Sequence, residues 1–255
     1  MSRTDEQRIA AMREGGQRLA RVLQSVIEEV RPGVTTGELD AIAEAGIRAA
    51  GGMPSFKGYN GYPASLCTSV NAAVVHGIPR PDWELHEGDI VGLDIGMVYD
   101  GAYTDMAFSV GVGAISKQAQ QLMQVTRESL RRGLRVVRAG VHTGDVGAVI
   151  QSYVEAAGFG VVRDLVGHGV GNAIHEEPQV PNFGRTKTGD VLHAGQTIAV
   201  EPMVTAGNYA VRTLADGWTV VTRDGSLAAH FEQTVAVTDK GYELLTPFPW
   251  EKSSQ

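Results

Sequence analysis

RPGVTTGELDAIAEAGIRAAG, residues 31–51, decides the fold because the chain repeats it. Residues 138–158 read RAGVHTGDVGAVIQSYVEAAG, an ungapped match at an offset of 107 in which nine of the 21 positions are identical. A repeat of this length indicates a duplicated structural unit. The chain is therefore predicted to consist of two related halves, roughly residues 1–113 and 114–255, that share one core within a single domain.

A second pair of segments shares the same offset. ELHEGDIVGLDIG, residues 84–96, aligns with VLHAGQTIAVEPM, residues 191–203, and Asp94 falls on Glu201. Two separate matches at one offset extend the duplication from a helix to the strands that follow it. Each copy thus offers a carboxylate at the same structural position.

Composition and charge narrow the class of protein. The 255 residues are 43% hydrophobic and 20% charged, as in an ordinary soluble globular protein, and no apolar run approaches the ~20 residues of a membrane span. The single cysteine, Cys67, and the charged start MSRTDEQRIAAMREGG favour a cytoplasmic protein. A net charge of −7 argues against autonomous binding to nucleic acid.

Hydrophobic periodicity and capping residues predict two pairs of helices, each pair followed by strands. Thr4 with Gln7 and Thr35 with Glu38 form candidate capping boxes at the first two helix starts. This pattern predicts an α+β fold with helices covering one side of a curved antiparallel sheet. The predicted helices are 4–30, 35–50, 115–138 and 143–157, and the β-rich stretches are 67–75, 89–110, 161–171 and 197–237.

The hairpin around Asp100-Gly101 can be tested by arithmetic. If these two residues form the loop, paired residues sum to 201 and Asp105 faces Gly96. Asp94 then points to the same face as Asp105, as a diagonal neighbour at roughly 7–8 Å. A register slip of one residue would turn the two carboxylates to opposite faces.

Five potential metal ligands occupy short phrases typical of strand ends. Four carboxylates that converge on one pocket repel one another unless cations neutralise them. One imidazole and four hard oxygen donors suit a pair of divalent ions such as Mn, Fe(II) or Co rather than a structural zinc. The predicted ligands are Asp94, Asp105, His168, Glu201 and Glu232.

Five ordered motifs resemble those of a type I methionine aminopeptidase of peptidase family M24. They are GYNGYPASLCTSVNAAVVHGIP, DIGMVYDGAYTD, GHGVGNAIHEEP, AVEPM and DGSLAAHFEQT, and the resemblance extends from the first helix to Leu245. It implies the pita-bread fold, with two pseudo-symmetric halves and a dimetal site at the centre of the sheet. The implied activity is removal of the initiator methionine of nascent proteins when the second residue is small.

The resemblance also implies roles for the predicted ligands. Asp94 would chelate one cation, while Asp105 and Glu232 would bridge both. His168 and Glu201 would complete the shell of one ion, and Glu201 would act as the proton shuttle for a water held between the ions. The cofactors would be two divalent ions, namely Co, Mn, Fe(II) or Zn, with cellular availability deciding among them.

Two histidines gain catalytic roles only through the resemblance. It places His175 over the scissile carbonyl, as a donor to the developing oxyanion, and His76 beside the scissile amide. The residues alone give no reason to choose these two over His86, His142, His193 or His230. The repeat-related pair His86 and His193 is predicted to be structural.

The methionine side chain would lie in an apolar, aromatic-lined slot. Read without the resemblance, GYNGYP is a glycine-rich turn with exposed tyrosines. The residues that correspond to the pocket of the family are Tyr59, Tyr62, Cys67 and Trp218. A polarisable sulfur and aromatic rings suit a flexible thioether.

The chain departs from the family pattern at positions that keep every ligand. Thr104 stands where Gly is common, His230 where Gln is common, Gln233 where His or Asp is usual, and Ile174 where a larger aromatic is frequent. The expected protein is a monomer that does not bind membranes, and the family's work on nascent chains implies transient association with the ribosome.

Three alternatives use related features. An X-Pro peptidase (prolidase or aminopeptidase P) would use the same five ligands but carries a preceding domain for which this chain has no room. A type II methionine aminopeptidase should have a large insertion between His175 and Glu201, where only 25 residues lie. A non-catalytic binding module on the same fold would lose the ligands.

Overall fold

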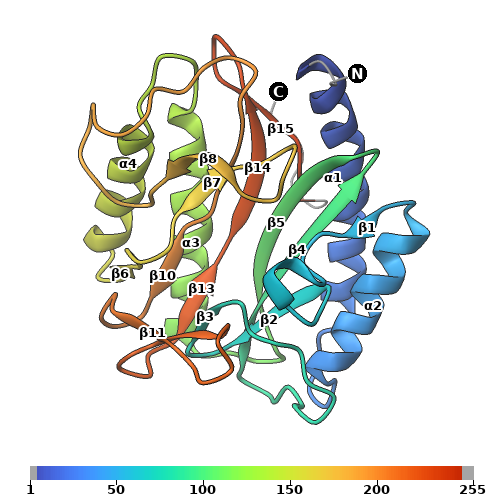
Figure 1. Cartoon of the computed structure of the whole chain (residues 1–255). Helices are drawn as coiled ribbons and strands as arrows, with labels where there is room; N and C mark the ends of the chain where they lie inside the picture. The colour runs from blue at the N-terminus through green and yellow to red at the C-terminus, as the bar shows by residue number, and fades with distance from the viewer. Residues whose placement is uncertain (1–4, 249–255) are drawn as a thin grey trace.

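The computed structural model describes residues 5–248 as four long helices around a central sheet (Figure 1). Each helix falls within a segment that the sequence predicts to be helical. The predicted cap at Thr4 lies outside the described residues. The helices are α1 (Asp5–Glu28), α2 (Thr36–Ala49), α3 (Lys117–Val136) and α4 (Thr143–Ala156), with a short 3₁₀ helix η1 (Tyr59–Gly61).

The second predicted capping box is present at the start of α2. The backbone N–H of Glu38 donates to Oγ1 of Thr35 at 3.1 Å, and the backbone N–H of Thr35 donates to Oε2 of Glu38 at 2.7 Å. These bonds satisfy two backbone donors that a helix start leaves without partners. The sequence pattern therefore located this helix boundary to the residue.

The central sheet is antiparallel throughout and has nine strands. Its order is β1-β4-β5-β14-β9-β7-β8, with β2 paired to β4 and β15 paired to β14. The strands are β1 (Met53–Pro54), β2 (Leu66–Val70), β4 (Ile90–Tyr99), β5 (Ala102–Gly111), β7 (Gly167–Gly169), β8 (Glu176–Val180), β9 (Thr197–Val200), β14 (Glu232–Val237) and β15 (Tyr242–Leu244). In Figure 1, α1 and α2 lie along the β4–β5 half of this sheet, and α3 and α4 lie along the other half. This arrangement confirms the predicted α+β class.

Two three-stranded sheets flank the central one, in the orders β13-β10-β6 and β11-β12-β3. Their strands are β3 (Ala73–Val75), β6 (Gly160–Val161), β10 (Met203–Thr205), β11 (Val211–Thr213), β12 (Val220–Thr222) and β13 (Ala228–His230).

Strand β8 is a difference from the sequence-based prediction, which assigned no strand to Glu176–Val180. Its sequence, EEPQV, is polar and contains Pro178, which discourages a strand assignment. The structure places β8 at the edge of the sheet, where only β7 pairs with it. Proline is tolerated on an edge strand because no neighbour needs its missing N–H.

The duplication is visible in the hydrogen bonds that enclose each helix start. The N–H of Gly33 donates to the carbonyl of Leu85, and the N–H of Gly140 donates to the carbonyl of Leu192, both at 2.8 Å. Each residue of the second bond lies 107 positions after its counterpart in the first. The offset found in the sequence is therefore an offset in structure, and the two halves are pseudo-symmetric.

The repeat-related histidines take part in the same framework. The backbone N–H of His86 donates to Oδ2 of Asp89 at 2.8 Å, and that of His193 donates to Oε1 of Gln196 at 2.7 Å. Both bonds close a turn immediately before a strand. The backbone N–H of each residue thus helps to close a turn of the repeated framework.

The hairpin β4–β5 has the predicted register. Gly96 pairs with Asp105, and the turn residues Asp100 and Gly101 have φ values of 45° and 70°. Positive φ at both central positions is the geometry of a type I′ turn. Since side chains alternate along a strand, Asp94 and Asp105 therefore face the same side of the sheet.

The opposite face of these strands is apolar. Phe108 of β5 packs edge-on against Phe231, the residue before β14, at 4.8 Å between ring centroids, and against Phe248 at 4.9 Å. The three rings join the main hydrophobic core. Because side chains alternate along a strand, Asp105 and Glu232 lie on one face of the sheet and the phenylalanines lie on the other. Packing of the phenylalanines in the core thus holds the strands that carry the carboxylates.

Candidate metal centre and substrate pocket

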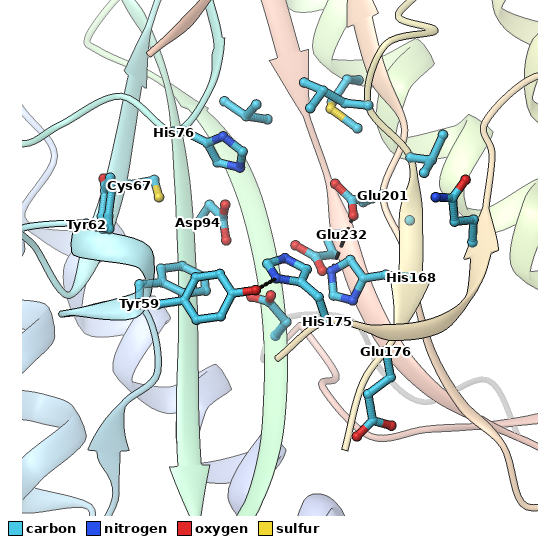
Figure 2. Close-up of a pocket in the computed structure, with 18 of the residues that line it drawn as sticks. Tyr59, Tyr62, Cys67, His76, Asp94, His168, His175, Glu176, Glu201 and Glu232 are labelled. Atoms are coloured by element: carbon cyan, nitrogen blue, oxygen red, sulfur yellow. Dashed lines mark hydrogen bonds and ion pairs between the residues drawn. The ribbon is translucent and has the colours of Figure 1, made fainter. Parts of the chain in front are cut away.

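All eleven site residues predicted from the sequence line a single cavity of about 490 Å³. Figure 2 shows residues of the first half on one side of it and residues of the second half on the other. The eleven are Tyr59, Tyr62, Cys67, His76, Asp94, Asp105, His168, His175, Glu201, Trp218 and Glu232. The cavity therefore lies between the two repeats.

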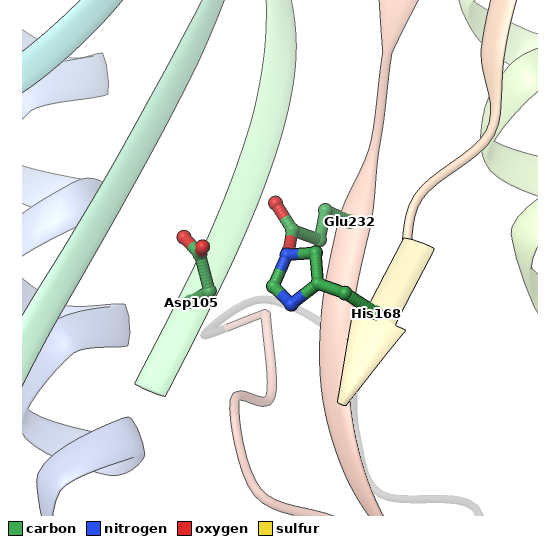
Figure 3. A group of neighbouring side chains, drawn as sticks. All are labelled: Asp105, His168 and Glu232. Atoms are coloured by element: carbon green, nitrogen blue, oxygen red, sulfur yellow. The ribbon is translucent and has the colours of Figure 1, made fainter. Parts of the chain in front are cut away.

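Three of the predicted ligands form the tightest group (Figure 3). One donor atom from each of Asp105, His168 and Glu232 lies within 4.8 Å of the others. These residues come from β5, β7 and β14, three strands that lie close together only when the whole central sheet is formed. A group of this size and composition can hold a divalent cation.

The remaining two predicted ligands border this group. Oε1 of Glu201, which directly follows β9, lies 3.5 Å from Nε2 of His168. Asp94 lies on β4 beside the strand that carries Asp105. The Asp94 and Glu201 pair, related by the repeat, therefore stands on the two sides of one cavity (Figure 2).

Burial makes it costly to ionise these carboxylates together. Burial raises the pKa of Asp94 and of Glu201 to about 7. It also raises the pKa of Asp105 and Glu232 well above their usual range, and neighbouring carboxylates add to the effect. Without added positive charge, burial and mutual repulsion therefore oppose the ionisation of all four groups at neutral pH.

Unpaired oxygen atoms test whether cations fit this site. Oδ1 of Asp94, Oδ1 of Asp105 and Oε1 of Glu232 are buried and have no hydrogen-bond partner among residues 5–248. Buried polar atoms are normally satisfied, so three such atoms around one cavity need an explanation. Hard oxygen donors facing a common space fit divalent cations, which would satisfy the oxygens and neutralise their charge.

His168 is oriented as a ligand. Its Nδ1 lies 2.9 Å from the carbonyl oxygen of Gly169, which leaves Nε2 directed toward the carboxylates. Burial lowers the pKa of His168, so the imidazole stays neutral, the form that binds a metal. A backbone partner on the second nitrogen is the usual way in which a ligating histidine is held.

The two other predicted histidines lie at different depths. His175 is exposed at the mouth and stacks edge-on against His168, at 4.4 Å between ring centroids. Its Nδ1 lies 2.9 Å from the hydroxyl of Tyr59. His76 lies deeper, and burial lowers its pKa to about 4, so it is neutral at physiological pH.

The apolar end of the cavity is built around Tyr62. This ring packs edge-on against Trp218 at 5.1 Å, and its hydroxyl donates to the carbonyl of Gly77 at 3.1 Å. Cys67, Phe56 and Ile174 belong to the same buried cluster. Of these residues, Phe56 also lines the cavity, and it could not be assigned from the sequence because a single apolar residue in a loop carries no periodic signal.

Sequence reasoning also missed His230. It is only 3% exposed, and its Nε2 lies 3.5 Å from Oε2 of Glu201. The available signal was its departure from the family pattern, in which Gln is common at this position, two residues before Glu232.

Comparisons with known proteins agree with the metal centre that the geometry of the site indicates. Residues 10–239 match metallopeptidase family M24. The chain belongs to that family. The methionine aminopeptidase of Clostridium perfringens is 51% identical, over 95% of this chain and 97% of that protein. Identity of this extent places the chain among the type I methionine aminopeptidases.

Solved structures agree. The methionine aminopeptidase of Rickettsia prowazekii has a TM-score of 0.93 and 41% identity, covering 97% of this chain and 99% of that one. The Xaa-Pro dipeptidase of Bacillus anthracis has a TM-score of 0.77 and 24% identity, but this chain spans only 62% of its length. The likeness to the dipeptidase shows the pita-bread fold alone.

The sequence predicts that the protein does not bind membranes, and the helices of the structure bear on this prediction. Among residues 5–248, no helix combines the length and apolar character that crossing a bilayer requires.

Proposed function

We propose that this chain is a metalloaminopeptidase that hydrolyses the peptide bond after an N-terminal methionine. The observation that carries the proposal is the joint cavity, in which five potential ligands adjoin an aromatic slot. The names of the most similar relatives support the same activity. The X-Pro alternative is not favoured, because the dipeptidase shares the fold at low identity and with a longer chain.

The cation site would consist of Asp94, Asp105, His168, Glu201 and Glu232. Two divalent ions held there would activate a water molecule for attack on the scissile carbonyl. Support comes from the orphaned oxygens of three of these residues and from the raised pKa of the four carboxyl groups. Co, Mn, Fe(II) and Zn are all compatible with this donor set.

Glu201 is proposed to carry the proton. Its carboxylate faces the cavity beside the proposed cation site, where it could accept a proton from the attacking water and return it to the leaving amine. Its Oε1 lies 3.5 Å from Nε2 of His168, and both residues line the cavity.

His175 and His76 are proposed to act on the substrate. His175 would donate to the oxygen that becomes negative during attack. Tyr59 supports this role: when its hydroxyl donates to Nδ1 of His175, the ring proton is held on Nε2, the atom left to face the substrate. His76, neutral and buried, would contact the scissile amide.

The aromatic slot is proposed to receive the methionine side chain. Tyr59, Tyr62, Cys67 and Trp218 would line it, with the thioether against rings and sulfur. The α-amine of the substrate would lie beside Asp94. Since the ligands crowd the remaining space, we expect only a small second residue to fit.

The cellular setting is also part of the proposal. The enzyme would act in the cytoplasm, as a monomer, on nascent polypeptides, with transient association to the ribosome. Its two halves, roughly residues 1–113 and 114–255, would form one catalytic domain, because each supplies residues to the same cavity.

The test is release of free methionine from a Met-Ala-Ser peptide by metal-stripped protein titrated with Mn or Co. We expect cation-dependent release, with no cleavage of Gly-Pro and little cleavage of a peptide in which a bulky residue follows methionine. Cleavage of Gly-Pro alone would assign the protein to the X-Pro peptidases. If no peptide were cleaved with any cation, the chain would be a binding module on this fold.

A further inference from the structure

His230 is a buried histidine to which the proposed chemistry gives no task. It ends strand β13 and is only 3% exposed. Its backbone is held on both sides: its N–H donates to Oγ of Ser109, and that hydroxyl donates to the carbonyl of His230, both at 2.9 Å. The backbone of His230 is therefore anchored to β5, the strand that carries Asp105.

The side chain, in contrast, lacks a partner where one is expected. Among residues 5–248, Nε2 of His230 is buried and finds no hydrogen-bond partner. Oε2 of Glu201 lies 3.5 Å from it. A shift of about half an ångström would bring the two atoms to an ordinary N–H···O distance.

Glu201 is thus flanked by two imidazoles. Its Oε1 lies 3.5 Å from Nε2 of His168, and its Oε2 lies 3.5 Å from Nε2 of His230. Its backbone carbonyl accepts a hydrogen bond from Nδ2 of the buried Asn182 at 3.1 Å. Different residues therefore contact the backbone and the carboxylate of Glu201, and together they set the direction of the carboxylate.

The position of the carboxylate favours a donor role for His230. Nε2 is the ring atom that faces Oε2 of Glu201, at 3.5 Å. A neutral imidazole has one N–H and one bare nitrogen. With the carboxylate facing Nε2, the tautomer that satisfies both groups carries its proton on Nε2.

We propose that His230 is a positioning residue for Glu201: its Nε2–H donates to Oε2 and holds the carboxylate so that Oε1 faces His168 and the cation site. This inference rests on the proposed function. It adds to the five ligands an outer contact that determines how one of them, also the proposed proton carrier, is presented. Partners of this kind commonly affect both metal affinity and turnover.

The test compares His230→Leu, which removes the donor at similar volume, with His230→Gln, which can supply an N–H in its place. Metal-stripped proteins are titrated with Co(II) by calorimetry, and visible spectra and Met-Ala-Ser kinetics are recorded. We expect His230→Leu to weaken Co(II) binding and lower kcat, each by about 10- to 100-fold, with KM little changed. His230→Gln should restore affinity, spectrum and kcat, and the exposed His193→Gln serves as the matched control.

Equal behaviour of His230→Leu and wild type would overturn the proposal, as would a His230→Gln variant as impaired as the Leu variant. If the Leu variant does not fold, ¹⁵N NMR of histidine-labelled, Zn-loaded wild type decides. The signal lost in His230→Gln should show the Nε2-protonated tautomer, and an Nδ1-protonated ring would contradict the proposal. Because calorimetry and NMR need no turnover, failure of wild type to release methionine would contradict the proposed function separately.

Discussion

The two halves of the molecule share a framework but supply the site in different ways. The first half contributes Asp94 and Asp105 from one tight hairpin, whose register is set by a two-residue turn. The second half contributes His168, Glu201 and Glu232 from or beside three strands that are far apart in sequence. The duplicated unit thus provided the scaffold, whereas the donor set diverged between the copies.

This difference has a consequence for rigidity. The two aspartates are held on adjacent strands by continuous backbone pairing. Glu201, in contrast, follows the end of β9, and neighbouring side chains hold it: Asn182 binds its backbone carbonyl, and two histidines flank its carboxylate. We therefore expect the first-half ligands to tolerate changes in their surroundings better than Glu201 does.

The largest expected effect tests whether the halves contribute equally at the tight group. Asp105→Asn and Glu232→Gln should each lower kcat by roughly 10³-fold or more, because each removes a proposed bridging charge at constant size. Steady-state assays with saturating Mn or Co measure this. Retained turnover in only one variant would show that the site depends on one half.

The second prediction concerns stability without cations. The pKa of Asp94 and of Glu201 is raised to about 7 in the folded protein, above the unfolded values. Stability is therefore retained below pH ~4 and lost as the pH rises through ~7. We expect metal-free protein to lose on the order of 4 kcal/mol of unfolding free energy for each of these two groups over this range.

Urea unfolding at several pH values measures this loss. Saturating Mn should abolish the site's contribution, and Asp94→Asn should reduce it. A metal-free protein with the same pH dependence as Asp94→Asn would mean that the carboxyl group of Asp94 is not perturbed.

Third, His175→Ala should lower kcat by about 10²-fold, as loss of an oxyanion donor does, while Co(II) still binds. His175 lies outside the group of three close ligands, so calorimetry should show unchanged stoichiometry. An effect confined to KM would contradict the proposed donor role.

The fourth prediction uses Tyr59→Phe to test whether a residue of the first half orients His175, a proposed catalytic residue of the second half. Removal of the hydroxyl that contacts Nδ1 of His175 at 2.9 Å should lower kcat about threefold to tenfold, the range for one hydrogen bond. KM for Met-Ala-Ser should change less, because the ring remains. Tyr242→Phe, at an exposed site, is the matched control, and equal kinetics in both variants would contradict the coupling.

The smallest effect separates framework from site. Thr35→Ala removes the cap of α2 and should lower the unfolding free energy by about 1 kcal/mol, with kcat unchanged. Chemical denaturation and peptide assays check both. A fall in kcat of the folded variant would show that the repeated framework and the cation site are not separable.

How much could be predicted from the sequence depended on how local the signal was. Asp94 and Asp105 could be placed on one face from turn chemistry and register alone. The offset of 107 gave the pseudo-symmetry, and the capping residues gave the start of α2. These features involve residues close in sequence or copied as a block.

Features that depend on long-range packing needed the resemblance or the structure. His76 and His175 could not be distinguished from other histidines without the family motifs. The contact of Tyr59 with His175 joins residues 116 positions apart, and the approach of His230 to Glu201 depends on the meeting of two strands. No local pattern reports such contacts.

Because the cavity lies between the repeats, a cation bound in it would hold the two halves of the protein together. Asp105 and Glu232 are 127 positions apart in sequence, yet they offer donor atoms within 4.8 Å. A cation shared by them would close a very long loop, much as a crosslink does, and would oppose separation of the strands that carry them. Under the proposed function, removal of the cations by a chelator would therefore destabilise the folded protein as well as inactivate it. Resistance to proteolysis would then measure cation occupancy.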